Sequence, residues 1–67
     1  MQVLFLTFRQ GVVVQIDLMQ DASSYDLKAT AELLLKERYN EGDDPPDCCR
    51  GYLLQNNRLV LALEEMA

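Results

Sequence analysis

Histidine is absent from the 67 residues of this sequence, and so are the short motifs that usually carry catalysis. There is no glycine-rich phosphate loop and no nucleophile elbow around a serine. The carboxylates show no shared pocket that would drive their pKa values apart for acid–base chemistry. We therefore expect no catalytic residue, no cofactor and no independent enzymatic activity.

Cysteine is scarce, and the two residues present, Cys48 and Cys49, are adjacent. Neighbouring cysteines cannot link distant parts of a chain, so the disulfide framework of small secreted domains is excluded and a reducing, cytoplasmic setting is favoured. Without histidine, a zinc site would need carboxylate ligands such as Asp44 and Asp47, a poor match to structural zinc sites, and the CxxC pair typical of redox motifs is missing. We expect no metal and interpret the pair as a strand entry, with one thiol buried and one exposed.

Positive charge is also sparse: the sequence has six Lys and Arg residues and eleven Asp and Glu residues, which gives a net charge of -5. The basic residues are scattered along the chain, which argues against binding to a nucleic-acid backbone. No apolar run approaches the roughly 20 residues of a membrane span, and no basic segment precedes the first apolar residues. These features predict one soluble, unprocessed domain over residues 1–67, with no membrane partner.

The first half of the sequence predicts a β-hairpin followed by a helix. Residues 2–8 are rich in β-branched and aromatic side chains, residues 9–11 form a turn, and residues 12–18 alternate between two faces. From residue 25 to about residue 39 the period changes to that of an amphipathic helix, which places Leu27, Ala31, Leu34 and Leu35 on one stripe. Ser23 and Ser24 are equally good candidates for its N-cap.

The acidic stretch EGDDPPDCCRG, residues 41–51, connects the helix to the next strand. Gly42 is suited to a left-handed helix stop, and Pro45 and Pro46 cannot continue a helix. The stretch resembles a calcium loop only in being acidic, since the spacing of an EF-hand is missing. A solvated, rigid connector is the favoured interpretation.

The last segment predicts a second hairpin, in which Asn56 and Asn57 form the two-residue turn. This register pairs Gln55 with Arg58, Leu54 with Leu59, Leu53 with Val60 and Tyr52 with Leu61. One resulting face, which we expect to join the core, holds Tyr52, Leu54, Leu59, Leu61 and Leu63. The alternative interpretation is a closing helix over residues 59–66, which also suits the helical propensity of this stretch.

Two hairpins around one helix predict an α+β, ββαββ β-grasp fold, with the helix packed on a four-stranded mixed sheet. A right-handed crossover would place the last strand beside the first and parallel to it, giving the strand order 2-1-4-3.

The order of these elements resembles that of ubiquitin and the ubiquitin-like domains. The residues that carry the resemblance are Met1-Gln2 before a strand, Thr7 near its end, Leu27-Lys28-Ala29 in the helix, and Pro45-Pro46-Asp47 followed by Arg50. The resemblance covers roughly residues 1–55 and departs from the family at Gly51, where an apolar residue is usual, and at the end of the chain, which lacks a Gly-Gly tail. It implies a β-grasp fold and docking of partner proteins on the open sheet face, but no conjugation.

The strand patterns point to an apolar surface opposite the helix. If Val3 and Phe5 face the helix, then Leu4, Leu6 and Phe8 face away from it, and we expect Leu53 and Val60 beside them. Contiguous exposed apolar surface usually marks an interface, although single exposed leucines are normal. The predicted protein-binding residues are Leu4, Leu6, Phe8, Leu53, Val60 and, at the rim, Arg58.

The favoured function is therefore a noncatalytic ubiquitin-like interaction module, an adaptor or a small subunit, that binds a partner helix or a second copy of itself. One alternative is a small acidic inhibitor, of viral or mobile-element origin, that presents Asp43, Asp44, Glu64 and Glu65 to a basic protein surface. Another is an accessory subunit of a multicomponent enzyme.

Overall fold

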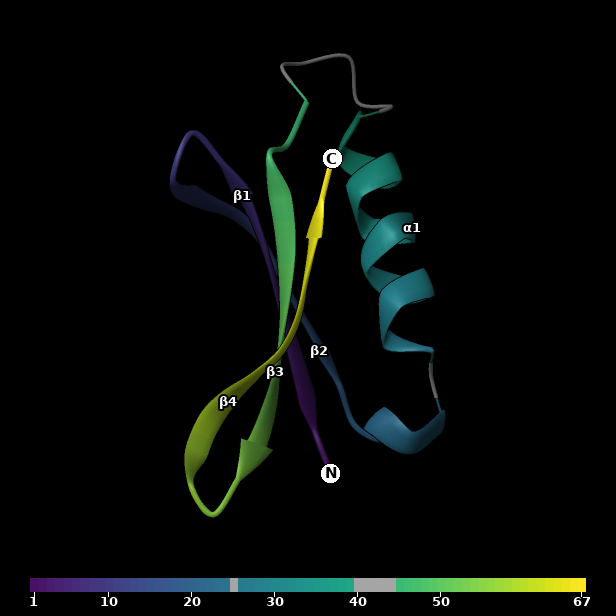
Figure 1. Cartoon of the computed structure of the whole chain (residues 1–67), viewed down its shortest axis with the longest axis vertical. Helices are drawn as coiled ribbons and strands as arrows, with labels where there is room; N and C mark the ends of the chain where they lie inside the picture. Colours follow the sequence, from purple (N-terminus) through teal and green to yellow (C-terminus); the bar gives the residue numbers. More distant parts are fainter. Residues whose placement is uncertain (25, 40–44) are drawn as a thin grey trace.

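A four-stranded antiparallel sheet carries one α-helix on one of its faces (Figure 1). The computed structural model of the chain describes residues 1–24, 26–39 and 45–67. The elements are strands β1 (Val3–Arg9) and β2 (Val12–Met19), a short 3-10 turn η1 (Ala22–Ser24), helix α1 (Leu27–Tyr39), and strands β3 (Cys48–Gln55) and β4 (Arg58–Met66).

Both predicted hairpins are confirmed, each with a two-residue turn in the left-handed region. The φ values are 52° at Gln10 and 78° at Gly11 in the first turn, and 50° at Asn56 and 63° at Asn57 in the second. Positive φ at both central positions matches the right-handed twist of the flanking strands. The closing helix considered for residues 59–66 is wrong, because β4 is extended from Arg58 to Met66.

The helix begins at Leu27, and its cap is Asp26 rather than Ser23 or Ser24. The Asp26 carboxylate accepts a hydrogen bond from the Ala29 amide at 3.1 Å, the contact of an N-cap residue with the third helical position. Ser23 instead lies in η1, where its amide and hydroxyl both donate to the Asp21 carboxylate. The predicted stop at Gly42 lies outside the described residues.

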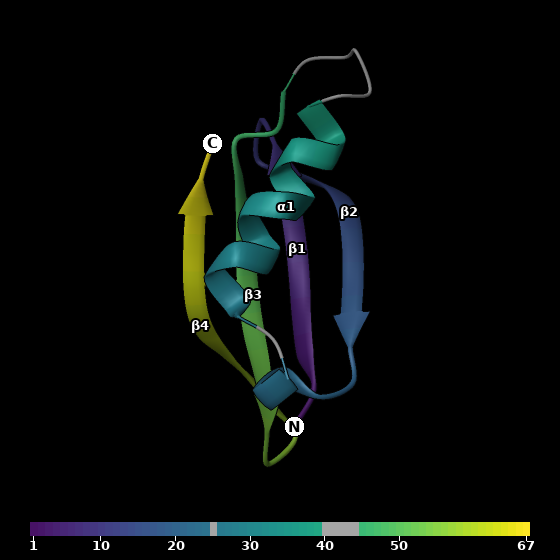
Figure 2. The same ribbon diagram turned by 90° about the vertical axis from the view of Figure 1, so that its right-hand side faces the viewer.

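The strand order is β2-β1-β3-β4, and every neighbouring pair is antiparallel. The expected mixed sheet of order 2-1-4-3 is therefore wrong: β3, not β4, lies beside β1 (Figure 2). Six residue pairs, from Val3–Leu53 to Phe8–Cys48, join β1 to β3, and β2 occupies the other edge of β1, so β4 can pair only with the free edge of β3. A Cβ atom on Gly51, which pairs with Phe5, would lie 3.1 Å from the Phe5 ring, so the glycine lets this ring pack closely on β3.

The core lies between α1 and the two central strands. Its buried members are Val3, Phe5, Ala31, Leu34, Leu35 and Cys49, which confirms the predicted apolar stripe of the helix. Thr7 is also fully buried, and its hydroxyl donates to the Cys49 sulfur at 3.7 Å. The polar group is thus satisfied inside the core, as buried hydroxyls generally must be.

Candidate functional site

One β-bulge decides which side chains of β2 share a face with those of β1. The two-residue turn alone would pair Leu6 with Gln15, but the register shifts between Thr7 and Phe8, so that Leu6 pairs with Ile16 and Leu4 with Leu18. Directly paired residues of an antiparallel sheet point to the same face, and a shift of one residue exchanges the two faces. The bulge therefore turns Ile16 and Leu18 of β2 away from α1.

A second bulge acts in the same way on β4. Tyr52 pairs with Leu61, whereas the preceding residue, Gly51, pairs with Leu63, which leaves Ala62 as the extra residue. Leu63 consequently packs against the core while Leu61 points to the opposite side of the sheet. Adjacent apolar positions of one strand thus serve two different surfaces.

We call the sheet surface opposite α1 the open face. Within the described ranges, no helix or strand covers it (Figure 1). Its side chains come from all four strands, as the registers and burial patterns show: Leu4, Leu6, Phe8, Val13, Ile16, Leu18, Arg50, Tyr52, Leu54, Leu59, Leu61, Glu64 and Met66.

Large apolar side chains on the open face are well exposed. The exposed fraction is 66% for Ile16, 54% for Leu18 and 54% for Leu61, so these residues add little to the core of their own chain. Of the exposed large hydrophobic residues in the described part of the chain, most lie on this face. A contiguous apolar surface of this kind usually marks an interaction site.

The charges of the open face neutralise each other. The Arg50 Nε donates to the Glu64 carboxylate at 2.5 Å, and the guanidinium carbon lies 4.9 Å from the centre of the Phe8 ring. The bond to Glu64 raises the pKa of Arg50, which stays protonated in any case. No other charged side chain among the described residues belongs to this face, so it carries no net charge.

The structure places half of the predicted binding residues on the open face. Leu4, Leu6 and Phe8 lie there, partly exposed, as expected. Leu53 and Val60 do not, because Leu53 pairs with Val3 and packs against the core from the helix-covered side.

Arg58 shares the helix-covered side as well. It lines a hollow of about 450 Å³ with Gln55, Asn56 and Val60 at the tip of the second hairpin. The predicted pairs within that hairpin are all correct. The error was to place Tyr52, Leu54, Leu59 and Leu61 in the core, when Leu63 alone of that predicted set lies there.

Sequence reasoning missed Ile16, Leu18, Tyr52 and Leu61 as members of the surface. The signal for the first two was present, since the alternation of residues 12–18 already placed Ile16 and Leu18 together. Their assignment to the open face needed the register with β1, which the bulge changes.

Both cysteine thiols are free and buried, so the prediction of one exposed thiol is wrong. Cys49 belongs to the core, and Cys48 lies on the other side between its cross-strand neighbours Phe8 and Met66. Burial raises the pKa of both thiols above the ordinary value, which keeps them protonated and poorly nucleophilic at neutral pH. This environment is that of a packing residue rather than a redox centre.

The acidic connector is described from residue 45 onward, and Glu41, Asp43 and Asp44 lie outside the described residues. The Asp47 carboxylate accepts a hydrogen bond from the backbone N–H of Gln10 at 2.6 Å, which connects the start of β3 to the first turn. Glu64, named above for the acidic inhibitor, is held by Arg50. The described residues contain no group of three or more His, Cys, Asp or Glu side chains positioned to hold a metal ion.

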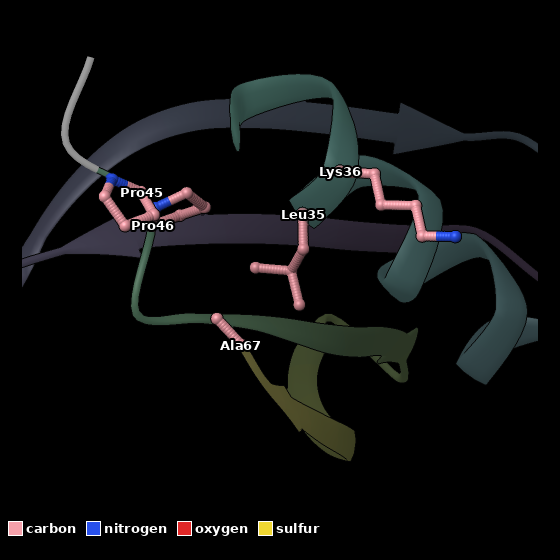
Figure 3. A pocket seen from close by; sticks show the side chains of 5 residues that line it. All are labelled: Leu35, Lys36, Pro45, Pro46 and Ala67. Carbon is pink, nitrogen blue, oxygen red and sulfur yellow. The ribbon is translucent and has the colours of Figure 1, made fainter. Parts of the chain in front are cut away.

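A hollow of about 400 Å³ lies where the end of α1 meets the entry to β3. It is lined by Leu35, Lys36, Pro45, Pro46 and Ala67. Figure 3 shows the Leu35 side chain reaching toward Ala67, while the Lys36 side chain extends away from both prolines. The described residues that line the hollow are apolar except for Lys36, and they provide no acid–base pair and no set of metal ligands.

Comparisons with protein-family models, with curated proteins and with solved structures gave no match to this chain. No helix in the parts that the structure describes has the length and apolar character needed to cross a membrane.

Proposed function

We propose that this chain is a noncatalytic protein-interaction module, an adaptor or a small subunit of a larger assembly, that docks through the open face of its sheet. The observation that carries the proposal is the exposure of large apolar side chains from β2, β3 and β4, beside the half-buried Leu4, Leu6 and Phe8 of β1, on one surface without net charge. A sheet covered on one side by a helix ordinarily has a polar second face, since that face meets water.

The chemistry of the remaining side chains supports a noncatalytic role. Cys48 and Cys49 are buried with raised pKa values, and Asp47 is engaged in a structural hydrogen bond to the Gln10 amide. The resemblance to ubiquitin-like domains supports a docking role for the same surface, although the strand order here differs from the β-grasp order. The proposal therefore depends on the exposed residues and not on kinship.

Adjacent residues of β4 allow a matched test of the surface. Leu61 lies on the open face and Val60 on the opposite side, and both are exposed. The experiment is affinity capture from extract of the cells that express the chain, with wild type, Leu61→Lys and Val60→Lys as baits. The two variants add the same charge to the same strand, and circular dichroism confirms that each is folded.

We expect proteins that are retained by wild type and by Val60→Lys and that are lost with Leu61→Lys. A charge placed at a buried contact residue should lower the affinity about 30-fold or more. Retention of the same proteins by Leu61→Lys would show that the open face is not the docking surface.

A further inference from the structure

The width of the exposed apolar surface limits what can cover it. Exposed apolar residues reach both edges of the sheet, with Ile16 and Leu18 on β2 and Leu59 and Leu61 on β4. The axes of four strands spaced about 4.8 Å apart span about 14 Å, and the sheet is about 19 Å wide when the full width of each strand is counted, whereas a helix with its side chains is only about 10–12 Å wide. One partner helix would leave one edge of the apolar surface in water, but a second four-stranded sheet would cover it completely.

The distribution of charge permits that second sheet to come from the same chain. Each copy has a net charge of -5, so two copies repel each other over most of their surfaces. The open face is the exception, because its two charged side chains, Arg50 and Glu64, form an ion pair within the chain. Two copies can bring these faces together without burying like charges against each other.

The area of the open face is sufficient for a specific contact. Its strands are seven to nine residues long, and a patch of that length and about 19 Å in width covers roughly 500 Å². Two such patches bury about 1,000 Å² in total, which is the lower bound for a biological interface.

We infer that the occupant of the open face is a second copy of this chain, packed sheet against sheet. The inference rests on the proposed function, since it names the partner of the same surface. The expected contact is isologous, with the two sheets about 10 Å apart and the side chains around Leu4, Leu6 and Leu61 interdigitating.

Pairing along the edge of β4 is a less favourable arrangement for two copies. The bulge at Ala62 and the charged residues Glu64 and Glu65 interrupt the flat, apolar edge that strand addition requires. Edge pairing would also leave the open faces of both copies in water. Packing of the open faces instead removes the largest exposed apolar surface that the described residues form.

Sedimentation equilibrium between about 1 and 300 µM tests the inference on wild type, Leu18→Lys, Leu61→Lys and Val60→Lys. We expect the mass of wild type and Val60→Lys to rise toward twice that of the monomer. Leu18→Lys and Leu61→Lys, on opposite edges of the open face, weaken the association at least about 30-fold. Using two strands guards against a single variant that fails to fold.

Three outcomes overturn the inference. If wild type stays monomeric over the whole concentration range, the chain does not associate with itself. The proposed function would still stand in that case if affinity capture retains proteins with wild type and loses them with Leu61→Lys. Equal dimerisation of wild type and both open-face variants places the contact elsewhere. The backbone amides on the free edge of β4 should exchange their hydrogens quickly in a dimer that packs through the open face. Slow exchange of these amides would assign the contact to the edge of the sheet.

Discussion

The two faces of the sheet divide the side chains of the chain in an unusual way. The face under α1 holds small or polar residues at several positions, among them Gly51, Cys49 and the hydrogen-bonded pair of Gln15 and Asp17. The uncovered face holds leucine, isoleucine and phenylalanine along the same strands. The covered face therefore has small or polar residues around its core members Val3, Phe5 and Leu63, whereas the open face is apolar apart from the Arg50–Glu64 pair.

Packing within the chain explains the residues on the face under α1, but it does not explain the large apolar residues on the open face. Little room is left on the covered face, because a Cβ atom added to Gly51 would lie only 3.1 Å from the Phe5 ring. On the open face, Ile16 and Leu18 make almost no contribution to a core, since both are more than half exposed. A chain of 67 residues has few apolar side chains to spare, so their placement there points to a contact outside the monomer.

The largest difference in the free energy of unfolding should come from replacing one phenylalanine on each face with alanine. Phe5 is fully buried, and Phe5→Ala should lower the free energy of unfolding by about 3–5 kcal/mol, enough to unfold much of a small domain. Phe8→Ala on the open face should cost less than about 2 kcal/mol, because Phe8 is partly exposed. Urea unfolding followed by circular dichroism measures both, and equal losses would contradict the division into two faces.

A smaller effect should follow from adding volume under the helix. Gly51→Val places methyl groups against the Phe5 ring and Leu63, which should destabilise the fold by about 1–3 kcal/mol. Gln55→Val adds a β-branched residue at an exposed position of the same strand and should be close to neutral. If urea unfolding shows both variants to be neutral, the space above Gly51 is not tightly filled.

The cap of the covering helix provides the next test. Asp26→Ala removes the acceptor for the Ala29 amide and should cost about 1 kcal/mol, whereas Asp26→Asn keeps an acceptor and should cost a few tenths. Thermal unfolding of the two variants distinguishes the cases. Identical midpoints would mean that the hydrogen bond at Asp26 does not stabilise the helix.

Local patterns were sufficient to predict the elements of this fold. The predicted strands and helix agree with the structure to within a few residues, because alternation, helical spacing and the two turns are properties of neighbouring residues. The turn at Asn56 and Asn57 also determined the pairs from Gln55–Arg58 to Tyr52–Leu61 correctly. The helix stripe was predicted for the same reason.

Arrangement between distant elements could not be predicted in the same way. The two hairpins meet along β1 and β3, from Val3–Leu53 to Phe8–Cys48, and this pairing joins residues far apart in the sequence that no local pattern relates. The bulges at Val14 and Ala62 then exchange the faces of whole strand segments. The side of Leu53 and Val60 depends instead on the pairing of Leu53 with Val3, so the open face was predicted to be apolar but these two residues were assigned to it wrongly.

The smallest change in the free energy of unfolding should follow from truncating Leu61, which can be compared with Leu63 on the opposite face of the same strand. Leu63 packs against the core, so Leu63→Ala should cost about 2 kcal/mol. Leu61→Ala, at a position 54% exposed, should change the stability of the monomer by less than about 0.5 kcal/mol in urea unfolding at about 1 µM. Above the concentration at which two copies associate, the same variant should lose further stability relative to wild type, because association adds stability that Leu61→Ala reduces. A loss at Leu61 that matches the loss at Leu63 at low concentration would show that the open face stabilises the single chain, and the reason to assign it to a partner would disappear.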